Sequence, residues 1–215
     1  MAPDDPSPAL ARVYAARDAA DLRAAYADWA GGYDRETLSL GYHLPFAVAA
    51  WVARHVPPGA GPLLDVGCGT GLAAPLLAAL GHAEVEGLDA SPEMLEVAGG
   101  RGYARLHRAT LGEPLPLPPG RYACAVSAGT YTEGHAPAAS LRDVLRLVRP
   151  GGLVILSLRD SIAGSDGFLA LFEALAREGL WRERERSAPF RAFLLAHPEV
   201  LVRTWAFEAL QAPAP

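Results

Sequence analysis

Three glycines at alternate positions follow an acidic residue in one short stretch of the chain. Asp65 closes an apolar run, and Gly67, Gly69 and Gly71 come directly after it. A helix-forming run begins at once, so the pattern predicts a strand, a tight turn and a helix. Glycine allows a ligand to approach the backbone closely, and the first N–H groups of the helix can donate to that ligand. The stretch is therefore a candidate cofactor-binding turn.

The glycine spacing separates two classes of cofactor. The dinucleotide fingerprint Gly-x-Gly-x-x-Gly places a pyrophosphate on the helix N-terminus. Leu72 stands where that fingerprint needs its third glycine, and Asp65 would repel a pyrophosphate while attracting an ammonium group. An NAD-dependent oxidoreductase is therefore disfavoured. The structural alternative is a glycine-rich turn that binds no ligand.

A second acidic residue follows at the distance expected of a ribose-binding carboxylate. Asp89 closes the next apolar segment, 22 residues after Gly67. A carboxylate about 20 residues past such a turn holds the ribose hydroxyls through charge-assisted hydrogen bonds. Ser91 then predicts a helix N-cap, with Pro92 at the first helical position.

The two stretches resemble the class I methyltransferases that use S-adenosylmethionine (SAM). The family patterns Asp-x-Gly-x-Gly-x-Gly and Asp-x-Ser-x-x-Met-Leu are met at residues 65–71 and 89–95. The resemblance extends over roughly residues 14–210 and is nearest to the Williams–Beuren-region methyltransferase-like proteins and their bacterial relatives. It rests also on Tyr33-Asp34, Leu111-Gly112, Pro114-Leu115-Pro116 and Arg149-Pro150-Gly151-Gly152. It implies a SAM-dependent methyltransferase that releases S-adenosylhomocysteine (SAH) and acts on a small molecule.

The resemblance also implies a set of site residues. Those expected to bind the cofactor are Tyr33, Asp65, Gly67, Cys68, Gly69, Gly71, Asp89, Ala90, Met94, Thr110, Leu111 and Ser127. Those expected to bind the acceptor are Tyr26, Tyr131 and His135. The chain departs from the family at two places, because Thr110 replaces an acid that often binds adenine and Ala123 replaces an acid of the fourth strand. The missing strand acid keeps a second hypothesis open, a regulatory or assembly module that binds SAM or SAH without catalysis.

A polar cluster follows the fourth expected strand, where ligands of open α/β sheets bind. It contains His135, and a neutral imidazole is available at physiological pH because histidine titrates near about pH 6.5. We therefore expect His135 to act as a general base or to orient the acceptor, with Glu133 as a residue that could orient His135 or compete with it. The alternative is that His135 caps the following helix or lies in solvent.

The elements around these motifs predict an α/β fold. Helical patterns cover residues 9–16, 18–30, 45–55, 72–80, 138–148 and 168–178, and strand patterns cover 63–66, 85–89, 104–109, 122–126, 153–158, 179–186 and 200–208. With the resemblance, they indicate a Rossmann-like, seven-stranded, mostly parallel sheet with helices on both faces, an antiparallel last strand and an N-terminal helical cap. We expect a single domain over residues 1–215, with a tail at 1–8, the cap at 9–55 and the core at 62–210.

Composition argues against several other classes. The chain of 215 residues is 51% hydrophobic with a net charge of −5, and it contains no lysine. No nucleic-acid partner is expected, since no basic block appears, and no run approaches the ~20 apolar residues of a membrane span. Neither the six histidines nor the two cysteines have metal-ligand spacing, so no metal is expected. Reduced cysteines and the lack of an apolar leader favour a cytoplasmic location. We expect a monomer or a homodimer.

Overall fold

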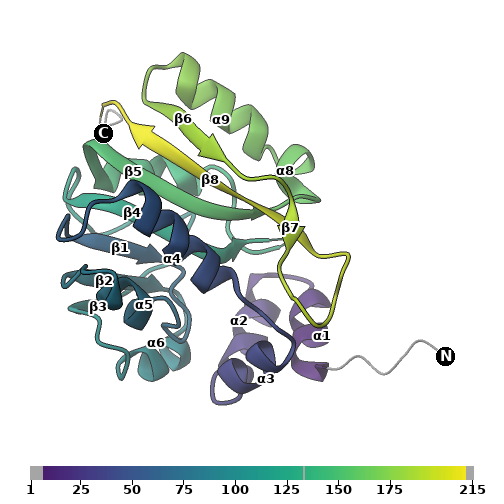
Figure 1. Ribbon diagram of the computed structural model, residues 1–215. Helices are drawn as coiled ribbons and strands as arrows, with labels where there is room; N and C mark the ends of the chain where they lie inside the picture. The colour runs from purple at the N-terminus through teal and green to yellow at the C-terminus, as the bar shows by residue number, and fades with distance from the viewer. Residues whose placement is uncertain (1–6, 133, 212–215) are drawn as a thin grey trace.

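Eight strands form one twisted sheet in the computed structural model, which describes residues 7–132 and 134–211 (Figure 1). The order is β3-β2-β1-β4-β5-β8-β6, and the short strand β7 also pairs with β8. Neighbours from β3 to β5 are parallel, whereas β8 is antiparallel to β5, β6 and β7. The strands are β1 Leu63–Val66, β2 Val85–Asp89, β3 Arg105–Arg108, β4 Tyr122–Tyr131, β5 Val148–Arg159, β6 Trp181–Arg186, β7 Phe190–Arg191 and β8 Leu201–Ala209. The predicted Rossmann-like sheet is confirmed, with β7 as an addition.

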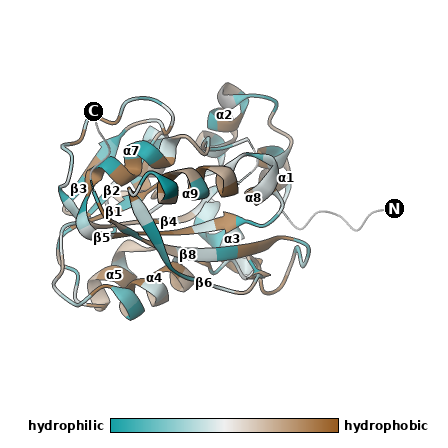
Figure 2. Cartoon of the chain, turned by 90° about the horizontal axis from the view of Figure 1, so that it is seen from above, coloured by the Kyte–Doolittle hydropathy of each residue, from teal (hydrophilic) through white to brown (hydrophobic). Residues whose placement is uncertain are grey.

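Helices cover both faces of this sheet, as predicted (Figure 2). On one face α4 (Leu44–His55) and α5 (Ala74–Ala79) pack against the strands, and on the other α7 (Ser140–Leu147) and α9 (Phe168–Arg177) do so. Strand β1 is buried on both sides, because Leu64 joins the core cluster on the side of α7 and α9, and Leu63 joins the cluster on the side of α4 and α5. This explains why the central strands are continuous apolar runs. Helix α6 (Pro92–Ala98) follows β2, and α8 (Ile162–Ser165) precedes α9.

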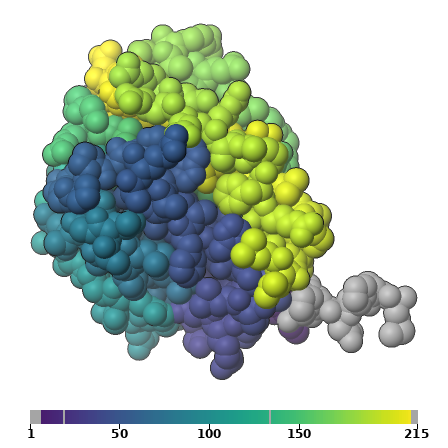
Figure 3. Space-filling view, in the orientation of Figure 1, coloured from purple at the N-terminus to yellow at the C-terminus, as the bar shows by residue number. Residues whose placement is uncertain are grey.

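Three helices form the cap: α1 (Pro8–Tyr14), α2 (Ala19–Trp29) and α3 (Tyr33–Ser39). Ser7 and Asp18 cap the first two through their side-chain oxygens. Trp29 lies in an apolar cluster that joins the cap to the segment around β7 and to β8, and Figure 3 shows the purple cap beside this yellow segment. The cap therefore packs on the C-terminal part of the chain.

The structure corrects several predicted boundaries. Helix α3 was not predicted, although Asp34 and Glu36 in its first turn suit the positive end of a helix. Helix α4, placed in the cap by the sequence analysis, instead packs on the sheet. Strand β4 extends five residues beyond the predicted end at Val126, because Tyr131 pairs with Leu158 after a register shift.

Two features are absent from the part of the chain that the structure describes. Within residues 7–132 and 134–211, no helix combines the length and apolar character needed to cross a bilayer. The same residues contain no group of three or more His, Cys, Asp or Glu side chains that could hold a metal ion. Residues 1–6 of the expected tail, and Glu133, lie outside the described part of the chain.

Candidate functional site

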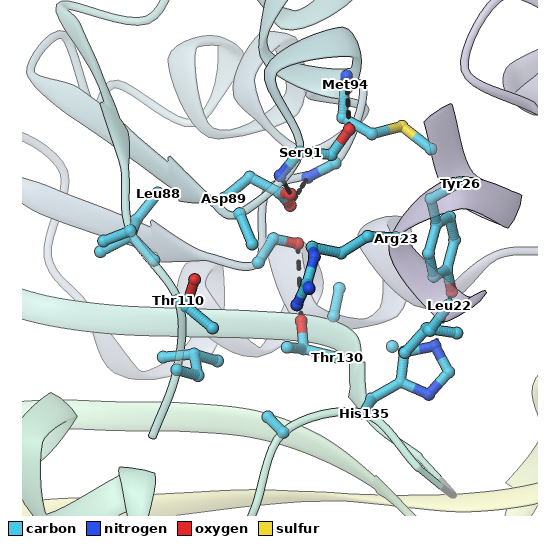
Figure 4. A pocket seen from close by; sticks show the side chains of 18 of the residues that line it. Leu22, Arg23, Tyr26, Leu88, Asp89, Ser91, Met94, Thr110, Thr130 and His135 are labelled. Carbon is cyan, nitrogen blue, oxygen red and sulfur yellow. Dashed lines mark hydrogen bonds between the residues drawn. The ribbon is translucent and has the colours of Figure 1, made fainter. Parts of the chain in front are cut away.

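A cavity of about 190 Å³ lies at the carboxyl ends of β1, β2 and β4 and is covered by α2 of the cap (Figure 4). Parallel strands bring these ends to the same edge of the sheet, which is why motifs far apart in sequence meet there. Ten of the predicted site residues line it: Tyr26, Tyr33, Gly67, Gly69, Asp89, Ala90, Met94, Thr110, Leu111 and His135.

The glycine turn brings bare backbone to the wall of this cavity. Gly67 and Gly69 have φ angles of 69° and 53°, in the left-handed region that favours glycine. A Cβ on Gly67 would lie 2.2 Å from Oγ1 of Thr130, whereas a Cβ on Gly69 would meet nothing within 4 Å. Gly67 is therefore required by packing against β4. Gly69 leaves open space beside the backbone, where a ligand can approach.

Asp89 joins this turn to the end of β2. Its carboxylate accepts hydrogen bonds from the backbone N–H groups of Gly69 at 2.8 Å and Ser91 at 2.9 Å. Burial raises the pKa of Asp89, and the backbone hydrogen bonds to Ser91 and Gly69 oppose that rise. Each carboxylate oxygen can accept more than one hydrogen bond. Since Asp89 lines the cavity, it can both hold the turn and accept from ligand hydroxyls.

Five predicted site residues lie behind the cavity wall. Asp65 is buried and accepts a hydrogen bond from the Tyr103 hydroxyl at 2.6 Å. Burial raises the pKa of Asp65 to about 7, with the Tyr103 hydrogen bond opposing the rise and the charge of Asp89 adding to it. Cys68 is buried, and Gly71 lies under the side chains of Tyr103 and Arg101.

The other two of these five belong to β4, where successive side chains point to opposite faces. The hydroxyl of Ser127 donates to the backbone oxygen of Val66 at 2.9 Å. The ring of Tyr131 packs edge-to-face on Phe168 at 5.5 Å, on the side of α9. Neither side chain lines the cavity, whereas their neighbours Ala128, Gly129 and Thr130 do.

Asp34 fixes the cap to the glycine turn. Its carboxylate accepts from Oγ1 of Thr70 at 2.5 Å and pairs with the guanidinium of Arg101. The Tyr33-Asp34 pair is part of the family resemblance, but no contact of Asp34 was predicted. Nothing local marks Thr70 or Arg101 as its partners, because they lie 36 and 67 residues away.

His135 links the loop after β4 to the cap. Its Nε2 lies 2.8 Å from the Tyr26 hydroxyl, and its Nδ1 lies 2.8 Å from Oγ1 of Thr132. The N-cap of α7 is Ala139 and the imidazole is half-buried, so His135 neither caps that helix nor lies in open solvent. Figure 4 shows Tyr26, Leu22 and His135 grouped on one side of the cavity.

A second, smaller cavity of about 50 Å³ adjoins the first. The two share Tyr26, Tyr33, Gly129 and His135. The rest of the wall includes residues of all three cap helices, of the end of β5 and of the segment around β7 and β8. Among its residues, Tyr14, Arg159 and Phe193 were not predicted as site residues. Their spacing carries no pattern, since only tertiary packing brings them together.

Ten residues that line the first cavity were not predicted as site residues, and Arg23 is the charged side chain among them. Leu22 and Arg23 lie on α2 and line the cavity beside Tyr26. Arg23 lies three residues before Tyr26 on a helix, so the two side chains are neighbours on one face. This spacing is the sequence feature that could have indicated Arg23.

Comparison with known proteins shows the family to which this chain belongs. A family described as a methyltransferase domain matches residues 63–152. The chain is 36% identical to Methyltransferase-like protein 27 of Homo sapiens over 80% of this chain and 74% of that protein. It is 37% identical to a ubiquinone biosynthesis O-methyltransferase of Cereibacter sphaeroides, over 44% of this chain and 40% of that one.

One solved structure shows the same fold at low sequence identity. It is a putative methyltransferase of Haloferax volcanii in complex with the Trm112 methyltransferase activator. Its TM-score is 0.62 at 18% identity, and the match covers 86% of this chain and 98% of that one.

Proposed function

This chain belongs to the class I SAM-dependent methyltransferases, and we propose that it methylates a small-molecule acceptor. SAM, the cofactor of this family, supplies an electrophilic methyl group on a sulfonium when bound. The protein then has to position the acceptor and exclude water.

The residues around the first cavity fit this cofactor. We assign the backbone at Gly67 and Gly69 to the methionine part, because the open space at Gly69 accommodates close approach. The half-buried carboxylate of Asp89 lines the cavity and suits the two ribose hydroxyls. Leu111 and Met94 offer apolar surface for the adenine ring, beside the hydroxyl of Thr110.

Residues of the cap and residues behind the cavity wall complete the proposed cofactor site. Arg23 carries a positive charge at the cavity wall and suits the carboxylate of the methionine part. Residues behind the cavity wall would hold the glycine turn and β4 in place: Asp65, Cys68, Gly71 and Ser127.

One observation supports a small-molecule acceptor: the second cavity lies beneath the cap and shares four lining residues with the first. The cap is tied down on both sides of this region, by Asp34 to Thr70 and by Tyr26 to His135. A polypeptide or nucleic-acid acceptor would need an open groove leading to the methyl group, and these contacts would have to break to provide one. A compact molecule can occupy the enclosed space.

A second candidate is a SAM-binding protein that depends on a protein partner. The Haloferax volcanii protein of the same fold is bound to an activator, and Ala123 replaces the acid often found in the fourth strand. In that case the isolated chain would bind SAM or SAH without turning it over.

The test combines ligand binding with the size of the labelled product. Calorimetry should show SAH binding to the wild type and binding at least about tenfold weaker in Asp89→Ala, because two charge-assisted hydrogen bonds are lost. Glu96→Ala removes an exposed carboxylate of α6 and serves as the matched control. With methyl-labelled SAM and a cell extract, the label should enter the low-molecular-weight fraction. Label confined to protein or RNA would contradict the proposal, and SAH binding without any transfer would support the second candidate.

A further inference from the structure

We propose that the acceptor is a planar, single-ring compound bearing an ionisable hydroxyl, and that its ring occupies the second cavity. This inference rests on the proposed methyl transfer. It adds the class of acceptor and the residues that would select it.

Six Tyr, Trp and Phe side chains line the second cavity, beside aliphatic and small residues. Trp29 packs edge-to-face with Tyr33 at 4.8 Å, and Tyr42 packs against Phe193 at 5.4 Å. All four rings line the cavity, together with Tyr14 and Tyr26. Aromatic faces and edges pair best with another ring, in offset or edge-to-face arrangements. The surface thus favours a flat acceptor over a saturated one of equal size.

The size of the cavity limits the acceptor to one ring. Its volume is about 50 Å³, against about 150 Å³ for a cavity that binds benzene, so even a single ring enters only when Tyr26 turns away from His135. Val200, Val202 and Leu44 close it with branched aliphatic side chains that leave little room to expand.

Polar groups lie on two different sides of this apolar space. On the side shared with the first cavity, the Tyr26 hydroxyl faces Nε2 of His135. On the side that is not shared, the guanidinium of Arg159 lies 5.3 Å from the centre of the Tyr14 ring. A ring with a hydroxyl at one end and a polar or anionic group at the other matches this arrangement. The hydroxyl would then point toward the cofactor cavity.

The contacts of His135 suit it to accept the hydroxyl proton. When Nδ1–H donates to Oγ1 of Thr132, Nε2 is left as the acceptor of the Tyr26 hydroxyl. Burial raises the pKa of Tyr26 well above its usual value, with Tyr33 adding to the rise, so this phenol stays a neutral donor. An acceptor hydroxyl that displaces Tyr26 would meet the same lone pair.

The transfer is then balanced without another reactant. A bond forms between the acceptor oxygen and the methyl carbon while the carbon–sulfur bond of SAM breaks. The electron pair of that bond stays on sulfur and gives neutral SAH, and the hydroxyl proton passes to Nε2 of His135. The hydrogen bond between Thr132 and Nδ1 holds the imidazole in place.

Binding to the SAH complex tests the acceptor class without requiring turnover. Phenol and cyclohexanol have nearly the same size and the same functional group, but only phenol is planar. In calorimetry with the wild-type SAH complex, phenol should bind at least about fivefold more tightly than cyclohexanol. Equal binding, or tighter binding of cyclohexanol, would overturn the inference even though SAH binds. Failure of SAH to bind at all would instead contradict the cofactor assignment.

Two variants test whether phenol binds in the second cavity. Ala192 lines only this cavity, so Ala192→Leu fills it and should weaken phenol binding about tenfold with SAH affinity unchanged. Because Ala192 is buried, the half-exposed wall residue Tyr14 provides a second variant, and Tyr14→Ala should also weaken phenol binding. Arg12→Ala on the same helix removes only an exposed ion pair with Asp28 and is the control. Phenol binding that neither Ala192→Leu nor Tyr14→Ala weakens would also overturn the inference.

Turnover tests the assigned base. With labelled SAM and a phenolic acceptor, His135→Ala should lower kcat by roughly 10²-fold or more and leave SAH affinity intact. The wild-type rate should rise with pH through a group that titrates near neutrality, and the variant should lose that rise. A loss of less than about threefold with an unchanged pH profile would exclude His135 as the base.

Discussion

Replacing Asp65 by asparagine should stabilise the protein at neutral pH and have a smaller effect in acid. The Asp65 carboxyl is buried, and burial is the main cause of a pKa of about 7 in place of the ordinary 3.8. The folded state therefore holds a proton on Asp65 that the unfolded chain releases between these values. By linkage, the contribution of Asp65 to stability is complete below about pH 4 and is lost as the pH rises to about 7.

The size of the effect follows from the same two values. The interval from 3.8 to about 7 corresponds to about 4 kcal/mol of unfolding free energy, at about 1.4 kcal/mol for each tenfold change in proton affinity. Asparagine keeps a side-chain oxygen that can accept from the Tyr103 hydroxyl, but it cannot ionise. The difference in unfolding free energy, Asp65→Asn minus wild type, should therefore grow by up to about 4 kcal/mol between pH 4 and pH 7.

Urea unfolding of both proteins across this range measures the difference directly. Carboxylates other than Asp65 titrate in both proteins and cancel in the subtraction. Tyr103→Phe is the control, because it removes the hydrogen bond that opposes the rise in the pKa of Asp65 and should move the transition to higher pH. A difference that stays constant with pH, or that shrinks toward pH 7, would refute the buried-carboxyl argument.

Two further predictions concern the glycine turn and the cap. Gly69→Ala should remain folded, because its Cβ meets no atom within 4 Å, but it should lose most SAH affinity in calorimetry. Gly67→Ala should instead lower the melting temperature, because its Cβ would lie 2.2 Å from Thr130. Unchanged SAH affinity in folded Gly69→Ala would contradict the assignment of this turn to the cofactor. Hydrogen exchange of residues 18–43 should slow when SAH is added, since Tyr33 lines the first cavity and follows a double glycine. Equal exchange with SAH bound would make the cap a static cover.

The resemblance implied the mostly parallel sheet, and the sequence drew attention to the stretches around Gly67 and Asp89, which line the first cavity. These features follow from local chemistry. Gly67 and Gly69 adopt the positive φ angles that their lack of a Cβ permits, and Ser91 caps α6 as its residue type predicts. The positions of Gly67, Gly69 and Asp89 at one edge then follow from the parallel order of β1 and β2.

Contacts between distant segments were decided only by the tertiary structure. The pairing of Tyr26 with His135 spans 109 residues, and the wall of the second cavity joins α1 to Phe193. The pKa of Asp65 likewise depends on burial and on the hydroxyl of Tyr103, 38 residues away. Residue type and spacing determine backbone conformation over a few residues. They do not determine which side chains meet when the cap closes on the sheet, because that depends on the packing of the whole chain.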